Sequence, residues 1–389
     1  MVKRVNSLPA EDAEFQMFVL DELGEELERQ GKDVLYLTIG IPELETPKAV
    51  VDTIVDALRD PVRVRQVYPE GLPEFREALA AHYRTRFGAD VDAAHVIVNT
   101  GTSPIFRNLF QVLAAGGLEV LLPRPYYSLY LISAKLAGAT IRFYDIDPAT
   151  LRLDIDSFRR NFDRDRTAVV VINSPGNPLG NVLNREEIEA IYDIVDHSAY
   201  VINDEIYNNC VFYEDYLCPL AILPEHRDVT IVTNSFSKGY RMYTKRVGFA
   251  FLPDELMMPM RIIQQHTLLT SDPCYQYGMM EALKDEESPA TLRDIYKARA
   301  EYTTQRLAGS PANPRRSEGG FYAILDCSAD YLASKGFASS KDLARDILEK
   351  VHVATVPGTD FGMPDGLRLA FCEARYNEGI DRLHDYFAG

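Results

Sequence analysis

Short apolar runs alternate with helical patterns over the middle of the chain, and this alternation restricts the fold more than any other feature. The apolar runs have the length and β-branched composition of strands, whereas the segments between them show helical periodicity. Strands are predicted at 95–99, 119–122, 140–144, 168–173, 200–203, 229–233 and 247–251, and helices at 105–115, 128–137 and 185–195. The pattern predicts an α/β fold with a mainly parallel, seven-stranded-type sheet and helices on both faces. Ligands of such sheets bind at the carboxyl ends of the strands.

The C-terminal third has a different, α+β pattern. Helices are predicted there at 289–307 and 340–349, and strands at 321–325 and 367–371. A helix at 14–30, which ends at Gly31, is expected to pack on this region. A chain of 389 residues exceeds one ordinary core. We therefore expect an N-terminal segment of the small domain (1–47), a large domain (48–285) and a C-terminal small domain (286–389).

Composition and charge exclude several kinds of partner. A formal net charge of −17 argues against nucleic acid, which requires a basic surface. No apolar run approaches the roughly 20 residues of a membrane span, and the polar N-terminus lacks an apolar signal core, which predicts a cytoplasmic protein without a membrane partner. The five cysteines form no CxxC pair and the seven histidines never occur at ligand spacing. We predict reduced thiols and no metal.

The segment 234–248 indicates the most specific chemistry. Lys238 follows the predicted strand 229–233 and two serines, and Arg246 precedes the next strand. A desolvated lysine flanked by cations can attack carbonyls, and hydroxyls beside a guanidinium suit a phosphate. Together they favour a site for pyridoxal 5′-phosphate (PLP). From this segment alone, a solvated Ser/Lys/Arg loop is an equal alternative.

Three other strand ends carry polar residues. The Gly-Thr-Ser sequence at 101–103 precedes a predicted helix, so it forms either an anion site or an ordinary N-cap. The sequence NSPGNPLG at 173–180 has the composition of a proline-rich turn. Asp204 follows the strand at 200–203 and would either cap a helix or pair with a cation, of which a pyridinium nitrogen is one.

In this order and spacing, the motifs resemble the PLP-dependent aminotransferases of class I/II, also called fold type I. The resemblance runs from about residue 36 to residue 385. It is carried by Gly40-Ile41-Pro42, the GLPEFR sequence at 71–76, Pro125-Tyr126-Tyr127, Asn177-Pro178, the DEIY sequence at 204–207, the SFSK sequence at 235–238 with Arg246, and the PGTDF sequence at 357–361 before Arg368.

The resemblance implies a role for each matching residue. Lys238 forms the internal aldimine and moves the Cα proton, Asp204 pairs with the pyridine nitrogen, and Tyr207 hydrogen-bonds the ring 3′-oxygen together with Asn177. Tyr127 is expected to stack on the ring. The phosphate is expected at Gly101, Thr102, Ser103, Ser235, Ser237 and Arg246. The substrate α-carboxylate is expected at Arg368, near Gly40 and Asn177.

The resemblance also implies a homodimer with shared active sites. In the family, a tyrosine before the Gly-Leu-Pro-Glu sequence reaches the phosphate of the neighbouring subunit. Tyr68 matches this tyrosine, although it lies closer to Gly71 than is common in the family.

Three functions are compatible with these motifs. The first is transamination of an α-amino acid to a 2-keto acid. The second is a lyase resembling 1-aminocyclopropane-1-carboxylate synthase, which would eliminate or replace the γ-substituent of S-adenosylmethionine. Leu179 favours this second reading, since aminotransferases usually have threonine there. The third is a PLP-fold binding domain, and an intact set of Lys238, Asp204 and Arg368 argues against it, because a binder needs no proton shuttle.

The resemblance also restricts the substrate. Aspartate-type members place an arginine of the partner subunit in the segment that matches 266–276. This chain has no arginine or lysine between Arg261 and Lys284. A neutral, aromatic or cationic side chain is therefore expected in place of aspartate.

Overall fold

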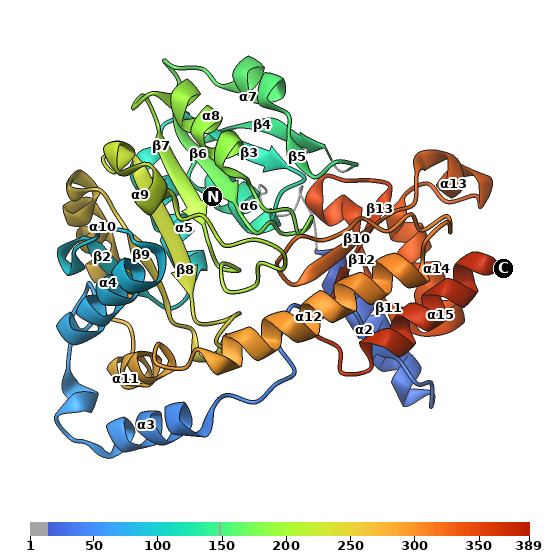
Figure 1. Cartoon of the computed structure of the whole chain (residues 1–389), viewed down its shortest axis with the longest axis horizontal. Coiled ribbons are helices and arrows are strands. Elements are labelled where there is room, and N and C mark those ends of the chain that lie inside the picture. Colours follow the sequence, from blue (N-terminus) through green and yellow to red (C-terminus); the bar gives the residue numbers. More distant parts are fainter. Residues whose placement is uncertain (1–14, 148) are drawn as a thin grey trace, which may run out of the picture.

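The computed structural model describes residues 15–147 and 149–389 and confirms the predicted α/β architecture (Figure 1). Its central sheet has the strand order β2-β9-β8-β7-β6-β3-β4-β5. The strands are β2 (Val96–Asn99), β3 (Glu119–Arg124), β4 (Thr140–Asp147), β5 (Arg152–Leu153), β6 (Thr167–Asn173), β7 (Tyr200–Asp204), β8 (Thr230–Ser235) and β9 (Gly248–Phe251). Strands β8, β7, β6, β3 and β4 are parallel, β9 runs antiparallel between β2 and β8, and β5 is an antiparallel edge strand. The seven predicted strands are all present, and the two-residue β5 is additional.

Helices cover both faces of this sheet, so its strands are apolar almost throughout. Val169 and Val171 belong to one apolar cluster, which includes α5 (Thr102–Leu113), α6 (Ser128–Leu136) and α10 (Asp254–Thr267). Val170 and Ile172 alternate with these residues along β6 and belong to a cluster on the other face of the sheet, because successive strand residues point to opposite faces. On that face lie α3 (Lys48–Arg59), α4 (Pro73–Phe87), α7 (Ile155–Asn161), α8 (Arg185–Val195), α9 (Pro219–Ile222) and α11 (Pro273–Ala282).

A second, smaller body contains a three-stranded antiparallel sheet in the order β10-β13-β12 and a parallel pair, β1-β11. These strands are β1 (Leu35–Tyr36), β10 (Tyr322–Asp326), β11 (Val353–Ala354), β12 (Val356–Pro357) and β13 (Gly366–Ala370). Its helices are α2 (Gln16–Arg29), α12 (Glu287–Arg306), α13 (Ala329–Ser334), α14 (Ser340–Val351) and α15 (Tyr376–Ala388). Leu20 of α2 joins their apolar cluster, so the N-terminal helix packs on the C-terminal third. The domain boundaries at 47 and 285 stay a prediction.

Three of the helices that lie outside the predicted ranges, α4, α10 and α11, contain proline. Helices α4 and α11 begin with a proline, and α10 contains Pro259 in its interior. Proline indicates a turn when it is read locally, although the first helical turn tolerates it. Glu14, the predicted start of the first helix, lies outside the described residues. Short 3₁₀ helices are η1 (Arg63–Arg65), η2 (Ala93–His95), η3 (Pro224–His226), η4 (Tyr243–Lys245) and η5 (Gly358–Phe361).

Within residues 15–147 and 149–389, every helix is too short or too polar to cross a membrane. The cytoplasmic location stays a prediction. The five cysteines are buried and carry free thiols.

Candidate active site

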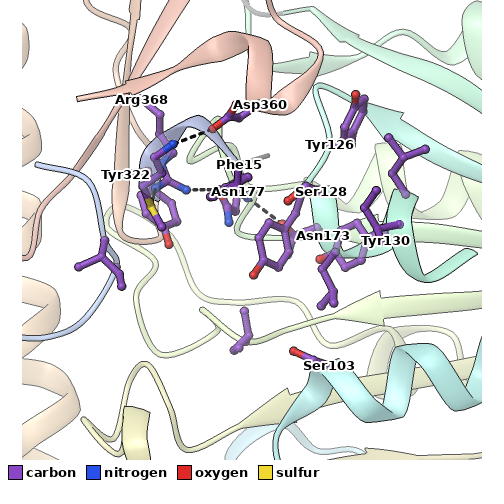
Figure 2. A pocket seen from close by; sticks show the side chains of 18 of the residues that line it. Phe15, Ser103, Tyr126, Ser128, Tyr130, Asn173, Asn177, Tyr322, Asp360 and Arg368 are labelled. Atoms are coloured by element: carbon purple, nitrogen blue, oxygen red, sulfur yellow. Dashed lines mark hydrogen bonds between the residues drawn. The ribbon is translucent and has the colours of Figure 1, made fainter. Parts of the chain in front are cut away.

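A cavity of about 690 Å³ lies between the carboxyl ends of the central strands and the smaller sheet (Figure 2). The large sheet contributes Asn173 at the end of β6 and Asp204 at the end of β7. The smaller sheet contributes Tyr322 of β10 and Arg368 of β13. The strand ends that sequence motifs single out therefore meet at one site, as parallel topology requires.

One end of the cavity has the properties of an anion site. Helix α5 begins at Thr102, and its N-cap Gly101 has a φ of 88° and provides no side-chain cap. A Cβ atom on Gly101 would lie 2.4 Å from Nη2 of Arg246, so glycine is required for this approach. Arg246 also donates to Oγ of Ser237 over 3.3 Å. The guanidinium of Arg246 and the N-terminal end of α5 are both positive, so they repel each other unless an anion binds there. This end of the cavity is therefore suitable for a phosphate.

The serines of this region have different positions. Ser103 and Ser237 line the cavity together with Thr102 and Arg246. Ser235, in contrast, accepts a hydrogen bond from the backbone N–H of Ser237 over 3.1 Å and lies outside the lining. Ser235 therefore holds the loop that carries Ser237, and Ser237 is the serine of this pair that faces the cavity.

Lys238 extends into the cavity from the loop that follows β8. Its Nζ donates to the carbonyl oxygen of Gly40 over 2.6 Å. The rings of Tyr243 and Phe321 lie 5.1 and 5.9 Å from Nζ. A Cβ atom on Gly40 would lie 2.3 Å from the hydroxyl of Tyr322 and 3.3 Å from Nζ of Lys238, so the absence of a side chain at Gly40 leaves room for both groups.

Asp204 is a buried carboxyl group with no lysine or arginine within ion-pair distance in the described part of the chain. Its side chain is 3% exposed. Tyr130 donates to its Oδ2 over 2.6 Å, and the N–H of Ile206 donates to Oδ1 over 3.3 Å. Burial raises the pKa of Asp204 to about 6, although these hydrogen bonds oppose the shift. A buried acid of this kind favours a ligand that brings its own positive charge.

The aromatic residues predicted near the ring of the cofactor also line the cavity. Tyr207 places its hydroxyl 3.1 Å from the hydroxyl of Tyr322, and burial raises the pKa of Tyr207 well above its usual range, so the phenol is neutral. Tyr127 meets Tyr130 edge to face, with 5.6 Å between ring centroids. Its neighbour Tyr126 stacks on Phe143.

Arg368 is 3% exposed and is held on several sides. Its Nη1 donates to Oδ1 of Asn177 over 3.2 Å, and its Nη2 donates to the carbonyl oxygen of Thr38 over 2.5 Å. The rings of Tyr322 and Phe361 lie 4.2 and 4.8 Å from its Cζ atom. Its buried Nε has no hydrogen-bond acceptor among the described residues. Such a donor leaves the guanidinium able to bind a carboxylate.

Several lining residues were not identified from the sequence, among them three that contact predicted site residues. These three are Tyr130, which contacts Asp204; Tyr322, which contacts Tyr207 and Arg368; and Asn173, whose Oδ1 accepts the N–H of Asn177 over 2.7 Å. Tyr130 follows the Pro-Tyr-Tyr motif by three residues, and this proximity to a recognised motif was the available signal. Tyr68, in contrast, is 40% exposed and lies outside the lining.

The arrangement fits PLP. It combines an amine for an aldehyde, an uncompensated buried carboxyl group for a ring nitrogen, and an anion site for a phosphate. Lys238, Asp204 and Arg246 supply these three features. Arg368 then remains available for a second carboxylate, that of a substrate.

Comparison with known proteins agrees with this chemistry. The model of the family "Aminotransferase class I and II" matches residues 32–385. The aspartate/prephenate aminotransferase of Thermus thermophilus is 30% identical over 357 residues, which cover 90% of each chain. The asparagine–oxo-acid transaminase of Streptococcus mutans is 28% identical and covers 92% of this chain and 93% of its own. The structure of Thermus thermophilus aspartate aminotransferase with maleate superposes with a TM-score of 0.89 at 28% identity, covering 99% of this chain and 100% of that chain.

Proposed function

This chain belongs to the aminotransferase class I and II family, and we propose that it acts on an α-amino acid with an uncharged apolar or aromatic side chain. The protein is a PLP-dependent transferase, and its reaction is transamination. The alternative of a lyase acting on S-adenosylmethionine finds no support among these relatives. A function limited to binding is excluded by the enzyme family.

The residues around the cavity have separate tasks in this proposal. When bound, PLP withdraws electrons from the substrate Cα and so makes its proton acidic. Lys238 would carry the cofactor, and its Nζ would take the proton from the substrate Cα and deliver it to the aldehyde-derived carbon of the cofactor. Asp204 balances the charge of the ring nitrogen, and Tyr207 and Asn177 contact the ring oxygen. Gly40 offers its carbonyl oxygen to Nζ of Lys238.

The two ends of the cavity bind anions of different kinds. Arg246, Thr102, Ser103 and Ser237 hold the phosphate, since they surround the free end of α5. Arg368 holds the substrate α-carboxylate, and its contact with Asn177 fixes the plane of the guanidinium. The face of Tyr127 is available for stacking on the ring of the cofactor.

The observation that carries the substrate assignment is the apolar lining near Arg368. Met17 contacts Arg368, and Phe15 packs on Phe361 beside it. The apolar lining of the same cavity also includes Phe18, Ile39, Tyr126, Leu129 and Ile132. An apolar or aromatic substrate side chain would remove this surface from water, at about 25 cal/mol per Å². A substrate carboxylate in the same place would lose hydration without a strong partner.

The charges at this end of the cavity also oppose an acidic side chain. Besides Lys238, Arg246 and Arg368, the described lining contains one further cation, Lys341. Asp360 lines the same region and is 9% exposed, with its Oδ2 accepting the N–H of Met17 over 3.2 Å. The carboxylate of Asp360 offsets Lys341, so no net positive charge remains for a second substrate carboxylate.

A substrate panel tests the assignment. The holoenzyme would be supplied with each of the standard amino acids and, separately, with several 2-keto acids as acceptors. We expect kcat/KM for phenylalanine, tyrosine, leucine or methionine to exceed that for aspartate by at least about tenfold, since an unpaired buried carboxylate costs several kcal/mol. Aspartate as the best amino donor would contradict the proposal.

We further propose that the active enzyme is a homodimer to which Tyr68 contributes. Exposed apolar side chains gather near Tyr68 on α3, on η1 and the loops that flank it, and on α10 and the loop that follows it: Leu58, Val62, Val64, Val67, Ile262 and Leu269. Clusters of this kind mark protein interfaces. The hydroxyl of Tyr68 would then reach the phosphate end of the partner's cavity.

A mixed dimer distinguishes a shared site from a self-contained one. Tyr68→Ala and Lys238→Ala would each be inactive or nearly so as homodimers. Co-expression of both variants forms a heterodimer in which one cavity carries both substitutions and the other carries neither. Recovery of roughly half the activity per heterodimer supports sharing, whereas a fully active monomeric species or absence of recovery contradicts it.

A further inference from the structure

Tyr322 lies at the junction of three groups that the proposed function uses. It is 2% exposed, and its hydroxyl oxygen lies 3.1 Å from that of Tyr207. The guanidinium of Arg368 lies over its ring, 4.2 Å from the centroid, and Figure 2 shows the two side chains next to each other. The same hydroxyl occupies the space that a side chain at Gly40 would fill beside Lys238.

The hydroxyl of Tyr322 can complete the hydrogen bonding of Tyr207. Burial keeps the Tyr207 phenol neutral, so it has one proton to donate and lone pairs to accept. If Tyr207 donates towards the cofactor, the remaining contact over 3.1 Å makes Tyr322 the donor to Tyr207. A hydroxyl that accepts one hydrogen bond becomes a stronger donor in the next.

The ring of Tyr322 connects this chain of hydroxyls to the carboxylate clamp. A guanidinium over an aromatic face is attracted by the ring and draws electron density from it. The Tyr322 hydroxyl is therefore a better donor while Arg368 is unpaired. A carboxylate bound to Arg368 would neutralise this field and weaken the donation to Tyr207. This connection is separate from the direct contact between Arg368 and Asn177.

We propose that Tyr322 is a positioning residue that transmits the occupancy of the Arg368 clamp to the hydroxyl of Tyr207. Its hydroxyl polarises Tyr207, and its ring fixes the guanidinium. The proposal rests on the role of Tyr207 at the cofactor that the proposed function assigns.

The experiment measures a property of the bound cofactor that does not require turnover. The absorbance of the holoenzyme would be titrated with pH for wild type, Tyr322→Phe, Tyr207→Phe and the double variant. Weaker hydrogen bonding to the anionic ring oxygen of the cofactor should move the midpoint of this absorbance titration to higher pH. We expect a rise of about half a unit to one unit in Tyr322→Phe, which is the size of one hydrogen bond. In the Tyr207→Phe background, Tyr322→Phe should add little.

A matched control separates this effect from loss of packing. Tyr144 is also buried and donates to the carbonyl oxygen of Val171 on another part of the sheet, so Tyr144→Phe should leave the midpoint unchanged. An unchanged midpoint in Tyr207→Phe would refute the proposed role of Tyr207 itself. A shift in Tyr207→Phe but none in Tyr322→Phe would refute only the role of Tyr322, as would equal shifts of Tyr322→Phe in both backgrounds.

Propionate, which has a carboxylate but no amino group, tests the connection to Arg368. Its binding should raise the midpoint in wild type, and the rise should be clearly smaller in Tyr322→Phe. Tyr322→Leu, which removes the ring, should weaken propionate binding about fivefold, whereas Tyr322→Phe should change it less than twofold. A propionate-induced rise of the same size in wild type and Tyr322→Phe would overturn the proposal.

Discussion

Tyr130 donates its hydroxyl proton to Oδ2 of Asp204 over 2.6 Å, and both side chains are buried. The tyrosine comes from α6 and the acid from the end of β7, so the contact joins two elements of the large body. Hydrogen bonds to a carboxylate stabilise its charged form. Tyr130 therefore keeps Asp204 closer to ionisation than burial alone would permit.

Replacing Tyr130 with phenylalanine should weaken PLP binding. The ring and its packing on Phe106 are retained, but Asp204 loses a charge-assisted hydrogen bond. Such bonds contribute about 1.5–3 kcal/mol, so the Kd for PLP should rise roughly ten- to hundredfold. Titration of the cofactor-free protein with PLP measures this. Tyr144→Phe is the control, and equal affinities of the two variants would contradict the role of Tyr130.

The stability of the cofactor-free protein should depend on pH through Asp204. Its pKa in the folded protein is about 6, above the ordinary value of 3.8, so the folded state binds the proton more tightly than the unfolded chain. The resulting stability is present near pH 4 and is lost as the pH rises through 6.

The variant Asp204→Asn should not show this loss. Its free energy of unfolding, relative to that of the wild type, should increase by on the order of 2–3 kcal/mol between pH 4 and pH 8. Urea unfolding of both cofactor-free proteins at several pH values measures the difference. Parallel pH profiles would show that Asp204 ionises in the folded state at its ordinary pKa.

Lys238→Ala should abolish transamination, because the chain then lacks the amine that reaches Gly40 and the centre of the cavity. Lys245→Ala is the matched control, since this lysine is near in sequence but contacts the Thr244 hydroxyl outside the cavity lining. The control should retain kcat within about twofold. The rate of keto-acid formation would be measured for both variants. Comparable losses of this rate in Lys238→Ala and Lys245→Ala would contradict the role assigned to Lys238.

Gly101→Ala should weaken PLP binding by displacing Arg246 from the anion site. The added Cβ would lie 2.4 Å from Nη2 of Arg246. Gly116 also has a positive φ, of 83°, but a Cβ there meets nothing within 4 Å. Gly116→Ala therefore controls for a side chain at positive φ. We expect at least a tenfold larger Kd for PLP in Gly101→Ala and an unchanged Kd in Gly116→Ala, measured by titration of the cofactor-free proteins.

Arg368→Ala should affect the substrate more than the cofactor. Its guanidinium is the buried cation with a free donor next to Asn177, whereas Arg246 lies at the phosphate end. Loss of a charge-assisted carboxylate contact should raise KM for the best amino acid about a hundredfold, with the Kd for PLP changed by less than about threefold. Steady-state kinetics and PLP titration test this, and a larger effect on PLP would place Arg368 at the cofactor.

Local sequence patterns were sufficient to predict the strands of the central sheet and the site residues that belong to a motif. A buried parallel strand is a short apolar run whatever lies next to it, and all seven predicted strands occur. Asp204 ends β7 and Lys238 follows β8, so parallel topology brings both to one edge of the central sheet, and Arg368 of β13 enters the same cavity from the smaller sheet. Helices α4 and α11 begin with a proline and α10 contains one in its interior, and a proline indicates a turn unless its position in the helix is known.

Contacts between distant segments depended on the folded arrangement. Tyr130 and Asp204 are 74 residues apart, and Tyr207 and Tyr322 are 115 apart. The chain has 22 tyrosines, and composition gives no reason to select these. Likewise, positions 235 and 237 are both serine in the sequence, but in the folded chain only Ser237 of this pair lines the cavity. Periodicity is a local property that the chain carries at every position, whereas the partner of a buried hydroxyl exists only after packing has brought two segments together.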